Sequence, residues 1–457
     1  MNRIYQKNII YKIKALYKSV CLIGFSFLLS ASGAAQVLSK SETDSLVNVV
    51  GQKLTDQYPF PEISGKYNDA ILQKLAAGKY YNLSPVEFAK QLTSDLQAVH
   101  KDVHLRIYQD VPVAGNTNKT PSISSPGILK SNNYGFEGVE LDRMTATAYV
   151  NVPGPMFPTQ ETFEMAANAM NLAAYSKYVI IDLRENPGGS GEIGRFLASY
   201  FYETGEEKYY LYGFHKDKAK DEQEWTYGYV PGKRNPEAKL YILTSRHTAS
   251  AAEGMAYAMQ KLNRATIVGD TTAGAGIAGS DFELKYELRM FLPVKMVVAP
   301  HTTEGWEGTG VIPDVETFKG DALLTAKNLI LADILKTDSV ASRKEAAQWL
   351  NEDKNVAVDQ QKYVGFTGKY TNDIVITSSK SGYTWNMLTA GKVTQSFELK
   401  RLKRDVFTVV NFSADPRIYN TRIYVKRNDA GKIESLVMKG LRKDGSIRIS
   451  PLNYKPV

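Results

Sequence analysis

One turn of the sequence places a serine where a nucleophilic hydroxyl could work. Residues 244–253 (TSRHTASAAE) follow the apolar run at 240–243, and Ser250 stands where the next helix is expected to begin. A hydroxyl at such a place is accessible, and the free amides of a helix N-terminus stabilise an oxyanion that forms beside it. Ser also begins helices simply as an N-cap, so this turn by itself leaves both interpretations open.

A second turn, at residues 182–191 (DLRENPGGSG), follows the apolar run YVII. Glycines between a strand and a helix let backbone amides approach a ligand closely, and the helix N-terminus adds partial positive charge. The turn could therefore hold a phosphate or form an oxyanion hole, or it could be a plain tight turn. The GxxxxGK[ST] spacing is absent from this turn, which weakens the phosphate interpretation.

A serine nucleophile needs a base, and the chain has five histidines: His100, His104, His215, His247 and His301. His247 shares the turn of Ser250, but it could equally point to solvent. His104 follows a predicted helix and enters a predicted strand. Spacing alone does not choose between these two. His301, Glu304 and Glu307 are three residues apart, but Pro300 and Gly305 argue against a helix that would gather them around a metal, so no metal site or cofactor is expected.

The two turns lie in a segment where strands and helices alternate. Strands are predicted near 145–152, 178–183, 240–243 and 265–268, and helices near 163–174, 191–202 and 250–262. Short, wholly apolar strands are typical of a parallel sheet that is covered on both faces. This order predicts an α/β core with crossover helices.

Five blocks of the sequence, in this order, resemble the superfamily of tail-specific (C-terminal processing) serine peptidases. They are DLQAVHKDVHLRI, YVIIDLRENPGGSGE, LTSRHTASAAEGMAYAMQ, ATIVGDTTAGAG and WEGTGVIPDVE. Within the superfamily, the chain is most similar to the branch that holds the tricorn protease core and interphotoreceptor retinoid-binding protein. The resemblance covers about residues 40–317 and implies a ClpP/crotonase-like α/β core.

The resemblance also implies roles for particular residues. The family's nucleophile corresponds to Ser250, and its oxyanion amides correspond to Gly188 or Gly189 and to Ala251. In the tricorn-like branch the base corresponds to His104, and the carboxylate behind it points to Glu307. The implied Ser250–His104–Glu307 relay requires His104 to reach Ser250 from the preceding helical segment.

The chain departs from the tail-specific branch in two respects. That branch uses a Ser–Lys dyad, but Ala275 takes the place of the lysine here. It also inserts a PDZ domain, for which the sequence between His104 and Asp182 leaves no room. Because the retinoid-binding relatives carry ligands on the same fold, a non-catalytic binder of a peptide or apolar ligand stays open beside an exported peptidase, as does an esterase.

The start of the chain predicts export. The first 35 residues contain five Lys and Arg and no Asp or Glu, then an apolar run at 20–29, then small residues that suggest cleavage near Ala35. We therefore expect a periplasmic or secreted protein, with an uncleaved anchor as the alternative. The single cysteine, Cys21, lies in this segment, which excludes thiol catalysis and disulfides in the mature chain.

Net charge and the distribution of predicted helices and strands give the remaining expectations. The formal net charge of +8 falls to +3 beyond residue 35, too little to predict nucleic-acid binding. Peptide or protein substrates are expected, and the sequence does not indicate an oligomeric state. The expected organisation is a signal peptide (1–35), a small helical domain (36–104), a linker and loop (105–131), the α/β peptidase core (132–317), a helical connector (318–357) and a small all-β domain (358–457).

Overall fold

The computed structural model describes residues 37–102, 104–109, 126–317, 321–354, 363, 365–379, 382–410 and 417–457. The predicted signal peptide, residues 1–35, lies outside these ranges. The described residues form two compact units, of which the first lies within 37–56, 60–109 and 281–292, and the second within 57–59, 126–280 and 293–457. Among the described residues, none of the helices has the length and apolar character needed to span a bilayer.

The first unit is built from three helices and strand segments. The helices are α2 (Lys40–Gln57), α3 (Pro61–Ala76) and α4 (Pro85–Val99). The predicted capping box begins α4, because Glu87 accepts the Ser84 N–H at 2.9 Å. Strand β1 (Arg106–Gln109) follows and pairs antiparallel with the start of β10 (Leu288–Val298), so that Arg106 lies opposite Phe291. His104 thus stands directly before an edge strand of this unit.

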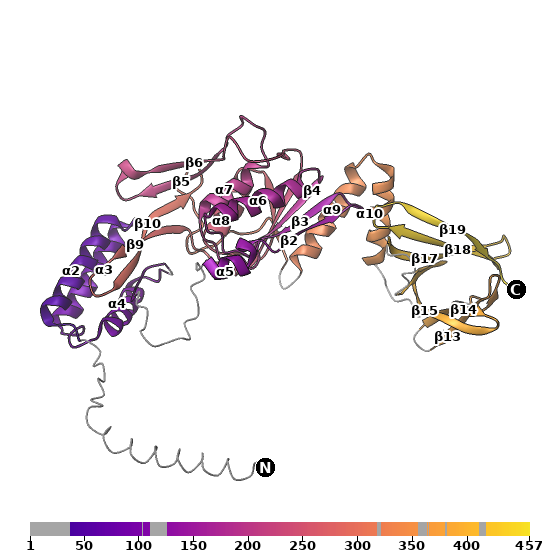
Figure 1. The fold of residues 1–457 in the computed structure, drawn as a ribbon, viewed down its shortest axis with the longest axis horizontal. Coiled ribbons are helices and arrows are strands. Elements are labelled where there is room, and N and C mark those ends of the chain that lie inside the picture. Colours follow the sequence, from indigo (N-terminus) through magenta and orange to yellow (C-terminus); the bar gives the residue numbers. More distant parts are fainter. Residues whose placement is uncertain are drawn as a thin grey trace, which may run out of the picture. The chain divides into compact units, whose positions relative to one another are not determined.

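The second unit contains the predicted α/β core, which is confirmed. Its sheet has the order β11-β8-β7-β4-β3-β2, with β2 antiparallel and the others parallel. Figure 1 labels β2, β3 and β4 of this sheet. The strands are β2 (Gly138–Asp142), β3 (Thr147–Asn151), β4 (Tyr178–Asp182), β7 (Lys239–Thr244), β8 (Ala265–Gly269) and β11 (Val315–Glu316). The helices of this core are α6 (Gln160–Ala173), α7 (Gly191–Ser199) and α8 (Ala251–Lys261).

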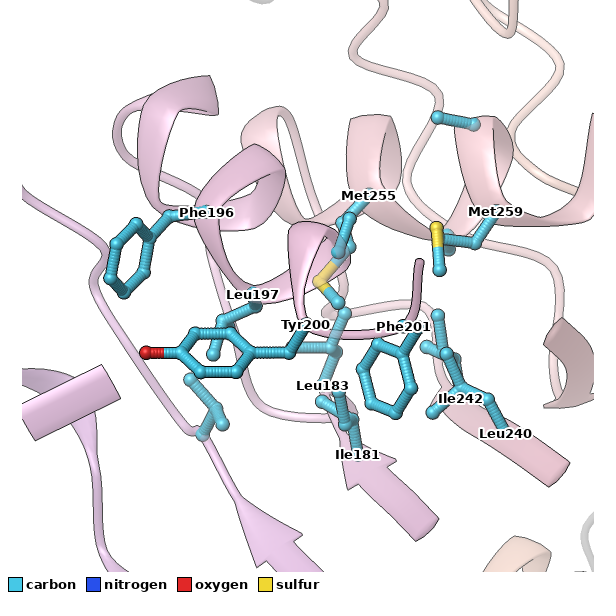
Figure 2. Close-up of a cluster of buried hydrophobic side chains, with 14 of the residues drawn as sticks. Ile181, Leu183, Phe196, Leu197, Tyr200, Phe201, Leu240, Ile242, Met255 and Met259 are labelled. Atoms are coloured by element: carbon cyan, nitrogen blue, oxygen red, sulfur yellow. The ribbon is translucent and has the colours of Figure 1, made fainter. Parts of the chain in front are cut away.

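The central strands are buried on both faces, as their apolar runs predicted. On one face, Ile181 and Leu183 of the β4 segment pack with Phe196 and Leu197 of α7 and with Met255 of α8 (Figure 2). On the other face, Tyr178, Ile180 and Leu243 pack against α9 (Ala322–Thr337). This double burial fixes the carboxyl ends of β4 and β7, from which both candidate turns emerge.

Shorter elements complete this part of the second unit. Strands β5 (Tyr209–His215) and β6 (Glu222–Trp225) form a hairpin around the one-turn helix η2 (Lys218–Lys220), and β5 pairs with the end of β10. Strand β9 (Ile277–Glu283) also pairs with β10. Before the sheet lie α5 (Pro126–Ser131) and the one-turn helix η1 (Asn133–Gly135).

The predicted all-β domain at the C-terminus is confirmed as a curled antiparallel sheet in which each strand pairs with the next. Its strands are β12 (Gly368–Tyr370), β13 (Ile374–Ser379), β14 (Gly382–Thr389), β15 (Lys392–Lys403), β16 (Val406–Val409), β17 (Ile418–Arg427), β18 (Ile433–Arg442) and β19 (Ile447–Tyr454). The sheet curls until its first strand meets its last, since the Val457 N–H donates to the Lys369 carbonyl at 3.0 Å. We call this domain the C-terminal barrel.

Helix α10 (Ala341–Lys354) attaches the C-terminal barrel to the core. The Arg422 side chain, 1% exposed, donates to the Glu352 carboxylate and to the Trp349 carbonyl, each at 2.7 Å. Its guanidinium also lies 4.3 Å from the centre of the Trp349 ring. The buried cation is therefore paired with a carboxylate and a carbonyl of α10, as a buried charge requires.

Candidate active site

Ser250 occupies a strained position at the start of α8. Its φ of +52° lies in the left-handed region, which residues other than glycine rarely adopt and which occurs mostly where the surrounding structure enforces it. The residue is partly exposed, at the carboxyl end of β7. The predicted accessible serine at a helix start is therefore present, and its backbone is held in an unusual conformation.

The two turns predicted to carry chemistry are joined by hydrogen bonds. The Ala249 N–H donates to the Asn186 carbonyl at 3.0 Å, and the Thr248 hydroxyl donates to the Leu183 carbonyl at 2.8 Å. Asn186 is completely buried, and its side-chain amide donates to the Val152 carbonyl at 2.8 Å. These bonds hold the glycine turn after β4 against the serine turn after β7.

Gly188 lies directly against Ser250. Its φ is +100°, and a Cβ added there would lie 2.8 Å from the Ser250 Cβ and 3.0 Å from the Ala251 nitrogen. No side chain fits in that space. The Gly188 N–H donates to the Asn186 side-chain oxygen at 2.9 Å, so this amide already has an acceptor. Gly189, with φ of +131°, packs against the backbone of Met156.

Glu253 lies three residues after Ser250, and the sequence analysis assigned it no role. Its side chain is fully buried and accepts the Ser250 N–H at 2.7 Å. The same carboxylate accepts the Thr272 hydroxyl and the amides of Gly274 and Ala275, the last two at 2.7 and 2.9 Å. The sequence does carry a signal for this contact, because Ser250 and Glu253 form the Ser-x-x-Glu pattern of a capping box at a helix start.

Glu307 contacts the loop that Glu253 holds. Its Oε2 accepts the Gly276 N–H at 2.6 Å, one residue beyond Ala275. A Cβ at Gly276 would lie 2.7 Å from the Glu307 nitrogen, so glycine is required for this close approach. The loop at 272–276 therefore contacts both the carboxylate that caps Ser250 and the carboxylate predicted for the relay.

An ion pair between buried Asp182 and half-buried Arg184 supports the base of the glycine turn. Asp182, 4% exposed at the end of β4, accepts hydrogen bonds from Nε and Nη2 of the Arg184 guanidinium and from the Tyr149 hydroxyl, the last at 2.7 Å. Burial and the Asp182 carboxylate raise the pKa of Tyr149, so its hydroxyl stays a donor. This pair fixes the chain direction immediately before the glycines.

His104 belongs to the first unit, whereas Ser250 and Glu307 belong to the second. The Asp102 carboxylate accepts the backbone N–H of His104 at 2.9 Å and lies 3.8 Å from the ring Nδ1. That Nδ1 is buried and has no hydrogen-bond partner among the described residues. Burial lowers the pKa of His104; Asp102 opposes the shift and Arg106 adds to it.

His247, the alternative base, lies at the surface. Its side chain is 72% exposed, and its Nδ1 lies 3.3 Å from the carboxylate of Glu185, which is 70% exposed. Its backbone N–H donates to the Ser245 hydroxyl at 3.0 Å. The ring therefore points to solvent with an exposed partner, as one of the two interpretations of this residue predicted.

Comparison with known proteins identifies the family. Residues 146–317 match the sequence model of peptidase family S41, and residues 32–134 match that of the N-terminal domain of Peptidase_S41 in eukaryotic IRBP. The chain therefore belongs to the S41 superfamily of tail-specific proteases, which confirms the resemblance stated above. The two matched segments contain His104, both turns and Glu307.

Curated relatives are similar over part of their length. The chloroplastic carboxyl-terminal-processing peptidase 1 of Arabidopsis thaliana is 28% identical over 141 residues, which are 30% of this chain and 27% of that protein. A probable CtpA-like serine protease of Staphylococcus epidermidis is 27% identical over 157 residues, 31% of each chain. The chain thus spans less than a third of the length of these relatives.

Solved structures that resemble this chain include two peptidases. A putative peptidase from Parabacteroides merdae has 18% identity and a TM-score of 0.45, with 66% of this chain and 99% of that chain covered. The photosystem II D1 C-terminal processing protease has 14% identity and a TM-score of 0.43, with 60% and 92% covered.

Proposed function

We propose that the chain is an exported serine peptidase that hydrolyses peptide bonds through an acyl-enzyme. The observation that carries the proposal is the strained, partly exposed Ser250 at the start of α8, packed against Gly188 and capped by buried Glu253. A serine that served only as a helix N-cap would take an ordinary extended backbone, without the cost of a left-handed conformation.

In the proposed reaction, His104 accepts the proton of the Ser250 hydroxyl as the oxygen attacks the substrate carbonyl. His104 then gives that proton to the leaving amine, and water hydrolyses the acyl-enzyme with the same base. The lowered pKa of His104 favours the neutral imidazole that a base requires. Its Nδ1–H, for which no hydrogen-bond partner is found in the described part of the chain, would donate to the Glu307 carboxylate directly or through one water.

The proposed oxyanion hole uses the amide of Ala251 with that of Gly188 or Gly189. Ala251 is the first residue of α8, so its N–H belongs to the unsatisfied end of the helix. Because the Gly188 N–H already donates to Asn186, Gly189 is the better second donor. Removal of one such donor typically lowers turnover by about 10²–10³-fold.

A Ser–Lys dyad does not fit this chain. Ala275, at the position of the lysine, is 7% exposed, and its N–H donates to Glu253. The loop that would supply a basic side chain therefore supplies amides to a carboxylate instead. We accordingly assign general-base catalysis to a histidine rather than to a lysine.

The domain organisation expected from the sequence stays part of the proposal, with a signal peptide at 1–35. Export rests on the order of basic, apolar and small residues there. Mass spectrometry of the native protein tests it: we expect a chain that begins near Gln36. A native chain that retains Met1 would refute cleavage.

A fluorophosphonate probe tests the enzymatic proposal. We expect stable labelling at Ser250, no labelling of Ser250→Ala, and a loss of peptide hydrolysis by this variant on the order of 10³-fold or more. A folded native protein that resists the probe would instead favour a non-catalytic binder of peptides or apolar ligands. Labelling with hydrolysis of esters but not of peptides would favour an esterase.

A further inference from the structure

Charge is segregated along this chain, which the modest net charge conceals. Residues 363–457, the C-terminal barrel, contain 17 Lys and Arg but only seven Asp and Glu, a net charge of +10. Residues 36–362 contain 34 Lys and Arg and 41 Asp and Glu, a net charge of −7. A single domain with such an excess attracts anionic partners, whereas the rest of the chain repels them.

The topology of the barrel gathers several of these cations at one end. Because each strand runs antiparallel to the next, the last residues of β12, β14, β16 and β18 and the first residues of β13, β15, β17 and β19 lie at the same end. Exposed cations at this end are Lys392, Arg417, Lys443 and Arg448, and Arg442 is half-buried beside them. We call these five residues the basic rim. The Lys443 N–H donates to the Arg417 carbonyl at 2.8 Å, which holds two of them together.

The basic rim contains few acidic side chains. Among the described residues at this end of the barrel, the acidic ones are Asp373 and Asp444, and Asp444 is engaged by the N–H and hydroxyl of Ser446. At the other end, Asp405 accepts a hydrogen bond from Arg427 at 2.8 Å and lies 3.7 Å from Arg404. Because Lys432 and Lys455 are exposed at that other end, positive charge is present at both ends, and the rim is distinguished by the apolar side chains that accompany it.

Exposed apolar side chains accompany the basic rim. Val393, Tyr419 and Ile449 are 56%, 53% and 58% exposed, and they stand within the first three residues of β15, β17 and β19, all of which begin at this end. Gly445, in the turn after β18, is buried near Met144 and Ala346, so one side of the rim adjoins the core.

We propose that the basic rim docks the protein onto an anionic phospholipid surface. Lysine and arginine ammonium and guanidinium groups would meet the lipid phosphates, and Val393, Tyr419 and Ile449 would enter the interfacial region. Exposed Val393 and Ile449 offer a nucleic acid neither a hydrogen bond nor a stacking surface, whereas a lipid interface accommodates them together with the Tyr419 ring. The proposal rests on the barrel alone and does not depend on the peptidase assignment.

Vesicle sedimentation tests the proposal. The protein is used from residue 36 onward, because that chain holds every described residue and lacks the apolar leader, which would bind lipid itself. We expect binding to vesicles of mixed phosphatidylglycerol and phosphatidylcholine at about 0.05 M salt, loss of that binding at about 0.5 M, and no binding to phosphatidylcholine alone. Equal binding to both kinds of vesicle would overturn the proposal.

Matched variants locate the surface. Lys392→Gln with Lys443→Gln should weaken binding about fivefold for each charge removed. Lys130→Gln with Lys327→Gln, on exposed positions of α5 and α9, removes the same charge and should leave binding unchanged. Val393→Ser with Ile449→Ser should weaken binding without altering its salt dependence.

Two outcomes would contradict this assignment. If the control pair weakened vesicle binding as much as the rim pair, the interaction would be one of overall charge and not of the rim. If duplex DNA bound more tightly than the anionic vesicles at the same salt, the partner would be a nucleic acid. Neither outcome involves hydrolysis, so each is distinguishable from failure of the proposed peptidase activity.

Discussion

The fully buried carboxylate of Glu253 accepts the backbone N–H of Ser250 at 2.7 Å. Because the same carboxylate accepts the Gly274 and Ala275 amides, the backbone of the serine and the loop at 272–276 share one acceptor. Four donors around one carboxylate offset the cost of burying its charge. We infer that Glu253 holds Ser250 in its left-handed conformation.

Glu253→Gln should therefore disturb both stability and the serine. The amide would present an NH₂ group to donors that need an acceptor, which should reduce the free energy of unfolding by about 1–3 kcal/mol. Fluorophosphonate labelling of Ser250 should slow by about tenfold or more, since a displaced nucleophile reacts poorly. Denaturant titration and labelling kinetics measure the two effects.

Glu192→Gln is the matched control for this substitution. Glu192 also lies in the first turn of a helix, α7, but it is exposed. Its substitution should change stability by less than about 0.5 kcal/mol and leave labelling unaltered. If both variants behaved alike, Glu253 would have no special role at Ser250.

The fold was predictable where apolar runs are long and uninterrupted. YVII and LYIL predicted β4 and β7 because a strand buried on both faces has no polar alternation. The Ser84–Glu87 pattern predicted the start of α4 for the same local reason: both partners of the cap lie within four residues. Such features depend only on residues that are close together in the chain, so a single sequence is enough to predict them.

The sequence analysis missed features that depend on distant segments. Asn186 bridges two turns through the Val152 carbonyl and the Ala249 amide, and nothing near Asn186 in sequence indicates these partners. The meeting of Lys369 with Val457 in the barrel is equally non-local. The net charge of the whole chain did not reveal the basic C-terminal barrel, because it averages the barrel with an acidic remainder.

The choice of base is tested by two histidine substitutions. His104→Ala should reduce peptide hydrolysis on the order of 10³-fold, as Ser250→Ala does, because loss of either member disables the proposed pair. His247→Ala should reduce it about twofold or less, because its partner Glu185 and its own ring are exposed. Steady-state kcat/KM of the purified variants decides between them. Equal losses would mean that His247 was misassigned.

The pH profile should show the effect of Arg106 on His104. Burial and Arg106 lower the pKa of His104 below its usual value of about 6.5, so the neutral base should persist, and kcat/KM should fall only below that pH. Arg106→Gln removes a positive charge that disfavours the imidazolium. The pKa should rise, and the acid limb should move to higher pH.

NMR titration of the His104 ring reads the same shift without catalysis. Lys66→Gln, which removes an equal charge from an exposed position on α3, should leave the His104 titration unchanged. A ring pKa that follows Arg106→Gln while the pH–rate profile stays fixed would show that His104 is not the base. Movement of both supports its proposed role.

The contact between Gly188 and Ser250 gives the sharpest steric test. A Cβ at Gly188 would lie 2.7 Å from the Ala249 carbonyl oxygen and 2.8 Å from the Ser250 Cβ, and φ of +100° is unfavourable for alanine. Gly188→Ala must therefore push the glycine turn away from the serine turn. We expect labelling of Ser250 to fall by about 10²-fold or more, because misplacement by about 1 Å has such an effect on reactivity.

Gly191→Ala is the control. This residue lies three positions later, at the start of α7, where an added Cβ meets nothing within 4 Å, so the change should be neutral or slightly stabilising. Parallel labelling and thermal unfolding of the two variants separate a local effect at Ser250 from general instability. Full reactivity of a folded Gly188→Ala protein would exclude this glycine turn from the active site, and the oxyanion donors would then have to be sought elsewhere.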